Sequence, residues 1–320
     1  MKGVTLHGGL LLLALLLAYP TWTRERTRPT DVQGAVIWER DTTEVVSITY
    51  RSAAREVEVS RRTEDGDAYL WGREVVPGSG SDSAMSDTLQ YPVGVAGGEL
   101  VRGLAELRVI RDLGVVDSTR TREYGLDDPS ASIAVGFVDG ERDIEVGDSI
   151  YGGSDRYGRD SSTGRVFVLP GSLVRPLRIG SGAIRERAVH YFPDADVARV
   201  RVEALGRERD MTRSDGGAGE AAVWTEPDST GPPDLTFGNF MERLGQLAIA
   251  GFEDEVPEAS LQQLLRVEYV GSDEQVLGFL ELFRDVAGGT YYLRSERTRV
   301  PARTVQTFAE RIEQDLSQIF

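Results

Sequence analysis

The chain has 320 residues, of which 40% are hydrophobic and 28% charged, a composition typical of a globular protein long enough for two domains. Asp and Glu outnumber Lys and Arg by 52 to 36, and the formal net charge of -16 disfavours binding to the phosphate backbone of nucleic acids. The chain has no cysteine, which excludes disulfides, thiolate catalysis and cysteine-based metal sites.

The N-terminus contains a segment suited to a membrane. Lys2 precedes an unbroken Leu/Ala run over residues 10–18, and this run with its flanks is nearly long enough to span a bilayer as a helix. Trp22 stands where aromatic side chains prefer the membrane interface. Because a good small-residue cleavage site is lacking, we predict an uncleaved signal-anchor over residues 1–28, with a cleaved signal peptide as the alternative.

Two features of the sequence favour opposite orientations of this segment in the membrane. Arg24, Arg26 and Arg28 lie after the apolar run, and the positive-inside rule would keep them in the cytoplasm. A segment of this kind at the extreme N-terminus nevertheless usually acts as an export signal. We therefore predict a single-pass protein of the inner (cytoplasmic) membrane, with residues 29–320 on the periplasmic, extracytoplasmic side.

The chain after this leader contains two segments in which the same patterns follow in the same order. Each begins with the alternation of a half-buried strand, then has a tryptophan, a loop rich in Pro and Gly, and apolar residues at helical spacing. These features lie at 45–60, Trp71, 77–86 and 100–110 in the first segment, and at 197–202, Trp224, 231–233 and 240–248 in the second. Trp71 and Trp224 thus occupy the same place in the order.

The later parts of the two segments also match. Asp139-Gly140 between apolar runs predicts a tight hairpin, since glycine tolerates positive φ, and residues 271–273 take its place in the second segment. A tyrosine-containing strand follows in each. Pro170 and Pro301 are then expected to open a helix, because proline suits the first helical turn.

These patterns predict an α+β fold: an N-terminal membrane anchor followed by two tandem related modules of antiparallel sheet with packed helices. The expected boundaries are 1–28 for the anchor, 29–188 for the first module and 189–320 for the second. The alternative is that the two patterns match by chance, as any α+β chain of this length allows.

Short motifs in the first segment carry a family resemblance. They are the leucine-rich leader, the tryptophan strand and the blocks at 124–131, 144–148 and 166–169. In this order they resemble an uncharacterised bacterial family, the domain-of-unknown-function family 4340, over nearly the whole chain. The second segment lacks the Gly-Leu-x-x-Pro block. Members are often encoded beside ABC-type transporter genes related to gliding-motility auxiliaries, so the resemblance implies an accessory role in the envelope and supplies no catalytic residues.

The block Tyr124-Gly125-Leu126, followed by Pro129, also has a direct physical interpretation. Gly125 can adopt a left-handed turn, and Pro129 keeps the residue before it out of a helix. We therefore predict a junction between a helix and a strand here. A paired-carboxylate catalytic site at Asp127 and Asp128 is the less favoured interpretation.

A search for catalytic or cofactor-binding patterns finds little. His7 lies in the leader, so His190 alone cannot build a histidine-rich zinc site. His190 is the one histidine left for a Ser/His/Asp arrangement, and the sequence lacks the G-x-S-x-G pattern, so a surface or strand-edge position is expected for it. The Gly-rich stretch 151–158 lacks the strand–loop–helix context of a phosphate loop, and Lys2 is the only lysine. We predict no catalytic residue, no metal, no cofactor and no nucleotide, hence a protein that is not an enzyme.

Four tyrosines are the candidate binding residues: Tyr151, Tyr157, Tyr291 and Tyr292. As exposed aromatic residues they could line a groove for glycan or peptide, although at strand spacing such tyrosines are more often cross-strand packing partners. The sequence thus favours a non-catalytic accessory or scaffold protein of an envelope complex, of an ABC-type transport or motility-like kind. A glycan- or peptide-binding envelope module is the alternative function, and a hydrolase using acidic residues ranks third.

Overall fold

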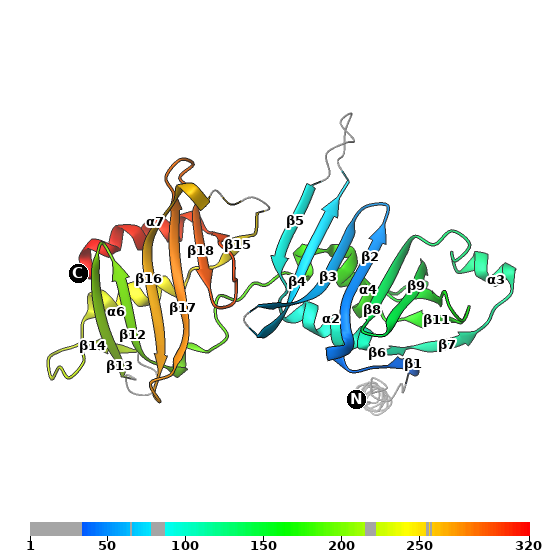
Figure 1. Ribbon diagram of the computed structural model, residues 1–320, viewed down its shortest axis with the longest axis horizontal. Helices are drawn as coiled ribbons and strands as arrows, with labels where there is room; N and C mark the ends of the chain where they lie inside the picture. Colours follow the sequence, from blue (N-terminus) through cyan, green and yellow to red (C-terminus); the bar gives the residue numbers. More distant parts are fainter. Residues whose placement is uncertain (1–33, 65, 78–86, 215–221, 254–255, 257) are drawn as a thin grey trace, which may run out of the picture.

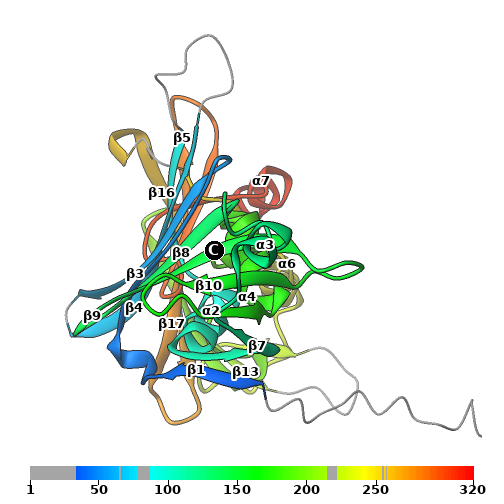
Figure 2. The ribbon, with the colours of Figure 1, turned by 90° about the vertical axis from the view of Figure 1, so that its right-hand side faces the viewer.

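The computed structural model describes residues 34–64, 66–77, 87–214, 222–253, 256 and 258–320. The predicted anchor over residues 1–28 lies outside the described residues. Two large antiparallel sheets stand side by side along the long axis of the molecule (Figure 1). Helices lie on the same side of both sheets, as the turned view shows (Figure 2). The described chain is therefore α+β, as the sequence predicts. None of its described helices is long and apolar enough to span a membrane.

Within the described residues, the first sheet has nine strands in the order β5-β4-β3-β2-β8-β9-β10-β11-β7. Its strands are β2 (Val45–Ser52), β3 (Glu56–Glu64), β4 (Asp67–Val76), β5 (Asp87–Pro92), β7 (Arg111–Gly114), β8 (Ala131–Phe137), β9 (Gly140–Ser149), β10 (Arg156–Asp160) and β11 (Val166–Leu169). A separate ribbon pairs β1 (Ala35–Glu39) with β6 (Glu106–Val109). The helical elements are η1 (Thr42–Glu44), α2 (Val95–Ala105), α3 (Ser118–Glu123), α4 (Gly171–Ile179) and α5 (Ser181–Ile184).

The second sheet has eight strands within the described ranges, in the order β14-β13-β12-β16-β17-β18-β19-β15. They are β12 (Val197–Ala204), β13 (Arg207–Ser214), β14 (Val223–Thr225), β15 (Ile249–Gly251), β16 (Leu261–Gly271), β17 (Val276–Asp285), β18 (Tyr291–Ser295) and β19 (Ala302–Thr304). The helical elements are η2 (Asp194–Asp196), α6 (Leu235–Leu244), η3 (Glu258–Ser260), α7 (Gln306–Asp315) and η4 (Leu316–Gln318).

The two sheets have the same connectivity. In each, a meander starts at a central strand, β2 or β12, and runs to one edge. The chain then passes through a helix, α2 or α6, to the strand at the opposite edge, β7 or β15. It returns to pair with the central strand, through β8 or β16, and meanders to the far edge before a last helix, α4 or α7. The first sheet adds β5 at its free edge.

Side chains repeat along with the connectivity. A short 3-10 turn, η1 or η2, precedes each central strand. Arg61 Nη2 donates to the carbonyl oxygen of Thr42, the first residue of η1, at 2.7 Å. Arg213 Nη1 donates in the same way to the carbonyl oxygen of Asp194, the first residue of η2. The equivalence of the two sheets therefore extends to individual hydrogen bonds.

Trp71 and Trp224 lie on corresponding strands, β4 and β14, but not at corresponding residues. Trp71 pairs with Ser60, whereas Trp224 pairs with Arg213, the counterpart of Arg61. The two positions differ by one residue. Because consecutive side chains of a strand point to opposite faces, the two indoles lie on opposite faces of their sheets. The expectation that the two tryptophans occupy the same place is therefore correct for the strand and wrong for the residue position and the face.

Two expected helix boundaries are wrong. The helical pattern over 100–110 ends at Ala105, and Leu107 lies in β6. Pro301 precedes the strand β19, while α7 begins later, after Val305. Pro170 does stand directly before its helix, α4. In both cases a short strand, β6 or β19, lies where a helix was expected. The spacing of the apolar residues there is compatible with a helix or a strand.

The predicted junction around Gly125 is confirmed. Tyr124 ends α3, and Gly125 has a φ of +67°, which favours glycine. A Cβ at Gly125 would lie 2.7 Å from the Asp148 carboxylate, so a side chain is excluded by space as well. Leu126 is fully buried, and β8 begins at Ala131. Asp148 N–H donates to Tyr124 O at 2.9 Å and joins the turn to β9.

The segment between the sheets is tied to both of them. Arg185 bridges to Val93 of the first half, and its Nη2 donates to Ala250 O of the second at 3.2 Å. Glu186 pairs with Arg297 at 2.6 Å, and both side chains are mostly buried. These contacts fix the path of the chain as it leaves α5 and enters the second sheet.

Further contacts join the second half to the first and bind the C-terminal residues to the second sheet. The guanidinium of Arg299 lies 4.0 Å from the ring centre of Tyr69, so a side chain of the second half packs on β4 of the first. At the other end of the molecule, Arg209 Nη1 donates to Ile319 O at 2.6 Å, and Arg207 donates to Phe320 O. The C-terminus is thereby fastened to β13.

Candidate ligand-binding site

The four predicted binding tyrosines do not form one site. Tyr151 is fully exposed on the turn between β9 and β10. Tyr157 stacks on Tyr124, with ring centres 4.1 Å apart. Tyr291 and Tyr292 belong to the other sheet and are only 5% and 3% exposed, so they do not line an open groove.

Tyr291 and Tyr292 are buried on opposite faces of β18, and the hydroxyl of each has a carboxylate partner. The Tyr291 hydroxyl donates to Glu313 on α7. The Tyr292 hydroxyl donates to Glu253 Oε2 at 2.7 Å. Burial, together with this hydrogen bond, raises the pKa of Tyr292 to about 12. These two tyrosines therefore act as packing residues, the alternative expected from strand spacing.

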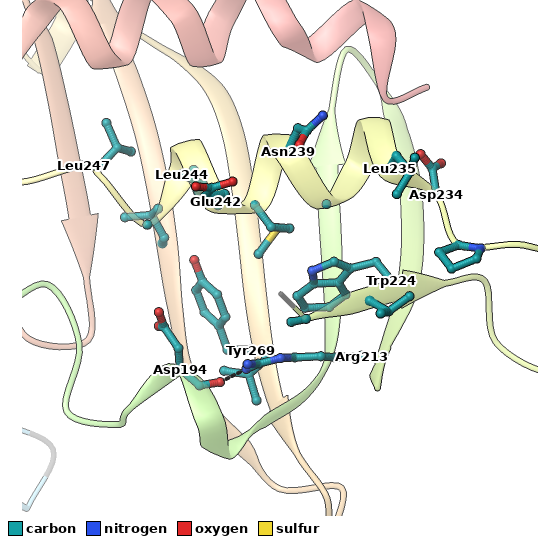
Figure 3. A pocket seen from close by; sticks show the side chains of 18 of the residues that line it. Asp194, Arg213, Trp224, Asp234, Leu235, Asn239, Glu242, Leu244, Leu247 and Tyr269 are labelled. Atoms are coloured by element: carbon teal, nitrogen blue, oxygen red, sulfur yellow. Dashed lines mark hydrogen bonds between the residues drawn. The ribbon is translucent and has the colours of Figure 1, made fainter. Parts of the chain in front are cut away.

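A cavity of about 430 Å³ lies between α6 and the helix-covered face of the second sheet (Figure 3). This volume is within the usual range for small-molecule sites. Its walls are mostly hydrocarbon. They are contributed by α6 and the residues that flank it (Pro233, Leu235, Gly238, Met241, Leu244, Leu247) and by the sheet (Val197, Val223, Trp224, Leu280).

The first module explains why the second has a cavity here. Trp38 lies four residues before η1, and His190 lies four residues before η2. Trp38 Nε1 donates to Leu104 O at 2.8 Å, and its ring meets Phe137 edge-on, so β1 and Trp38 close the end of the first core. The residues around His190 form no such ribbon, and the smaller imidazole stands where the indole would be.

Tyr269 is the main polar group of the cavity floor. Its side chain is 7% exposed and points from β16 toward α6 (Figure 3). The equivalent position in the first sheet holds Val135, since Val135 pairs with Ile48 as Tyr269 pairs with Val200. Burial, and secondarily the carboxylates of Asp194 and Glu296, raises the pKa of Tyr269, so its hydroxyl stays protonated.

The Tyr269 hydroxyl makes no hydrogen bond with any residue that the structure describes. Its ring is held in place by an aromatic cluster, with ring centres 4.7 Å from His190 and 5.3 Å from Phe192. His190 Nδ1 lies 3.1 Å from Glu296 Oε1, and the imidazole is 17% exposed. The expectation of a surface or strand-edge histidine is therefore wrong. The cluster presents a rigid, unpartnered hydroxyl to the cavity.

Arg213 supplies a second unpartnered donor in the cavity wall. Its Nη1 is used by Asp194 O, but its Nε is buried and has no acceptor among the described residues. Buried donors are normally satisfied, so an orphan N–H beside a cavity marks a place where a ligand acceptor would be stabilised.

The mouth of the cavity carries carboxylates. Asp194 and Glu242 are exposed lining residues. Asp234 also lines the cavity, but it caps α6 by accepting from Phe237 N at 2.9 Å and pairs with Arg209 at 2.8 Å. Burial acts to raise the pKa of Asp234, and these bonds outweigh it, so its pKa is lowered. Asp194 and Glu242 are thus the carboxylates left to meet a ligand.

Sequence reasoning missed Tyr269 and Arg213. The one available signal was a tyrosine in β16 at a position where the matching strand of the first segment has valine. In the described ranges, no group of three or more His, Cys, Asp and Glu side chains is placed to hold a metal ion. The arrangement offers a binding cavity with two fixed donors and an acidic mouth.

Comparisons with known proteins place the chain in a family. A family model described as "Domain of unknown function (DUF4340)" matches residues 98–264, just over half of the chain, from α2 of the first half to β16 of the second. No curated protein and no solved structure matches the chain. The family resemblance expected from the motifs is thereby confirmed, and the chain belongs to the DUF4340 family.

Proposed function

We propose that this protein is a non-catalytic, membrane-anchored accessory or scaffold subunit of an extracytoplasmic envelope complex, of an ABC-type transport or motility-like kind. Residues 1–28 hold it in the inner membrane, and residues 29–320 face the periplasm. The apolar leader before an acidic body supports the anchoring. The family resemblance supports the envelope role by association.

We also infer that residues 29–188 and 189–320 are two related modules. The same strand connectivity in both sheets supports this, together with the matched hydrogen bonds of Arg61 and Arg213. The observation that carries the scaffold proposal is the arrangement of these sheets. The helices lie on one side of both sheets (Figure 2), and the opposite faces stand side by side along the long axis (Figure 1). A surface built in this way suits the holding of partner proteins.

The absence of cysteine gives a direct test of topology. Tyr151→Cys places the only thiol of the chain at a fully exposed position, and Leu282→Cys places one in the core as the control. We expect a membrane-impermeant maleimide to label Tyr151→Cys, and not Leu282→Cys, in cells whose outer membrane has been permeabilised. The protein should sediment with membranes. Labelling only after lysis, with the protein recovered as a cytoplasmic monomer, would contradict the proposal.

Partners are tested by purification in mild detergent from the source cells after cross-linking. We expect stoichiometric envelope proteins to accompany the full chain. A charge-reversed variant of the open face of the second sheet, Arg201→Glu, should lose them, since Arg201 lies there beside Glu208 and Glu268. Arg102→Glu, on the exposed side of α2, is the matched control.

A binding module for cell-wall glycan or peptide is the second candidate function, and the aromatic side chains of the first sheet are the observation that favours it. The exposed ring of Tyr151 and the stack of Tyr157 on Tyr124 are the remaining candidates for glycan contact. Binding of the full chain to purified cell-wall fragments should weaken in Tyr151→Ala and Tyr157→Ala. Unchanged binding in both variants would remove the tyrosines from this function.

A further inference from the structure

We propose that the cavity beneath α6 binds a single acyl chain, as an ester or amide whose head group is neutral or cationic. The site is independent of the accessory role proposed above, and its failure would leave that role untouched. The cavity is elongated, since its lining runs from Pro233 before α6 to Leu247 beyond its end. A helix of ten residues covers about 15 Å, so a linear apolar group suits this space better than a compact one.

The two ends of the cavity differ in chemistry. Trp224 and Leu235 lie at one end, and Tyr269 and Asp194 at the other (Figure 3). The side chain of Arg213 starts at the strand position paired with Trp224 and runs toward Asp194 (Figure 3). An acyl chain directed along α6 would bury its methylenes against the first group. Its carbonyl oxygen would then lie at the second, where the Tyr269 hydroxyl and Arg213 Nε are donors without an acceptor in the part of the chain that the structure describes.

The charge at the mouth selects the head group. Asp194 and Glu242 are exposed there, and the chain as a whole carries a net charge of -16. A phosphate or carboxylate head would face both carboxylates and the long-range field of the protein. A neutral head avoids this cost, and a quaternary ammonium gains attraction.

An extended peptide is the less favoured occupant. It would normally add to the free edge of the sheet at β14 through backbone hydrogen bonds. That edge is partly used, because Asp234 N–H already donates to Trp224 O at 2.8 Å. The hydrocarbon walls in addition contain few groups that could satisfy a peptide backbone.

The test uses the full chain in nanodiscs and a choline ester of a twelve-carbon acyl chain with a diazirine at the chain end. After irradiation, we expect cross-links on α6 and around Trp224, mapped by mass spectrometry. Gly238→Trp fills the cavity, since a Cβ there lies 3.7 Å from Trp224 Cδ1. It should abolish these cross-links while leaving those on the membrane segment. Equal labelling of α6 in Gly238→Trp overturns the proposal.

Competition with unlabelled probes tests the head group. We expect lauroylcholine and 1-lauroylglycerol to compete, and laurate to compete at least tenfold less well. The double variant Asp194→Asn, Glu242→Gln should remove the advantage of lauroylcholine over laurate. Decanoylcholine should compete about tenfold less well than lauroylcholine, because each buried methylene contributes about 0.8 kcal/mol. Competition that is the same for all heads, or by an apolar peptide alone, would contradict the assignment.

Tyr269→Phe tests the carbonyl contact and preserves the ring that packs on His190. We expect it to weaken lauroylcholine about fivefold and to leave dodecyltrimethylammonium, which has no carbonyl, unchanged. Tyr91→Phe is the matched control, because Tyr91 also has a buried hydroxyl with no partner among the described residues but lies in the first sheet. A thermal melt of each variant shows that it is folded. Equal effects of Tyr269→Phe and Tyr91→Phe would remove Tyr269 from the site.

Discussion

Arg61 and Arg213 are equivalent residues of two different sheets, and each donates a hydrogen bond to the first carbonyl of the 3-10 turn before the central strand. Arg61 makes a further bond, from Nε to Val45 O at 3.1 Å. In Arg213 the same Nε has no acceptor among the described residues and lies in the wall of the cavity. Both arginines therefore keep the bond to the 3-10 turn, and in the second module the Nε of Arg213 has no acceptor among the described residues.

The first prediction concerns this difference. Arg61→Ala should lower the free energy of unfolding by about 2–3 kcal/mol, because hydrogen bonds from a charged group to carbonyls are lost. Arg213→Ala should cost less, since it also removes an unsatisfied buried N–H. Urea denaturation followed by circular dichroism measures both. Arg102→Ala, whose ion pair with Glu99 is largely exposed, is the control and should stay within about 0.5 kcal/mol. An Arg61→Ala effect no larger than the control would contradict the assignment.

A second prediction compares two glycines. A Cβ on Gly72 would lie 2.2 Å from the ring of Tyr91, which is fully buried. Gly72→Ala must displace that ring and should destabilise the protein by about 2 kcal/mol or more. Gly98 lies within α2, and its Cβ would meet nothing within 4 Å. Gly98→Ala should therefore stabilise the protein by about 0.5–1 kcal/mol. The melting temperature is expected to fall in Gly72→Ala and to rise in Gly98→Ala. Shifts of the same sign in the two variants would contradict the packing described around Gly72 and Tyr91.

The third prediction is a dependence of stability on alkaline pH. The pKa of Tyr292 is raised to about 12 by burial and by its bond to Glu253, from an ordinary value of 10. Above pH 10 the unfolded chain releases this proton while the folded chain retains it, so stability falls between pH 10 and 12. Tyr292→Phe should reduce the slope of unfolding free energy against pH in that window. Tyr151→Phe, at a fully exposed side chain, should not change the slope. Identical slopes for all three proteins would refute the prediction.

The fourth prediction concerns the segment between the modules. Glu186→Gln leaves the guanidinium of Arg297, 12% exposed, without its carboxylate, and should cost about 3–5 kcal/mol. Because Glu186 also accepts from the N–H groups of Arg187 and Ala188, the segment itself should loosen. Limited proteolysis should then cut within residues 186–193. Glu99→Gln is the exposed control, and resistance equal to the control would show that the pair does not hold the segment.

Local patterns were enough to predict much of the fold. Asp139-Gly140 and Gly125 with Pro129 specify turns through backbone geometry alone, so the hairpin between β8 and β9 and the junction after α3 could be predicted. The faces of Trp71 and Trp224 could not, because a difference of one residue in a short strand reverses the face and leaves the composition unchanged.

The candidate site depends on contacts between distant residues. Two of its residues, His190 and Tyr269, stand at the places in the second module where the first module has Trp38 and Val135. Neither substitution has a local signature. Only the three-dimensional equivalence of the two sheets shows which positions to compare, and for this reason the sequence alone does not indicate this site.

Because the C-terminal residues are hydrogen-bonded to β13, a label at the C-terminus can be used to measure the distance between the two modules. Phe320 is held by Arg207 at one end of the long axis, and β1 lies in the other half of the molecule (Figure 1). A fluorophore at the last residue would report the position of the second module rather than independent motion of the C-terminal residues. Paired with a second dye at Tyr151→Cys, it would report any change in the distance between the two modules when a binding partner arrives.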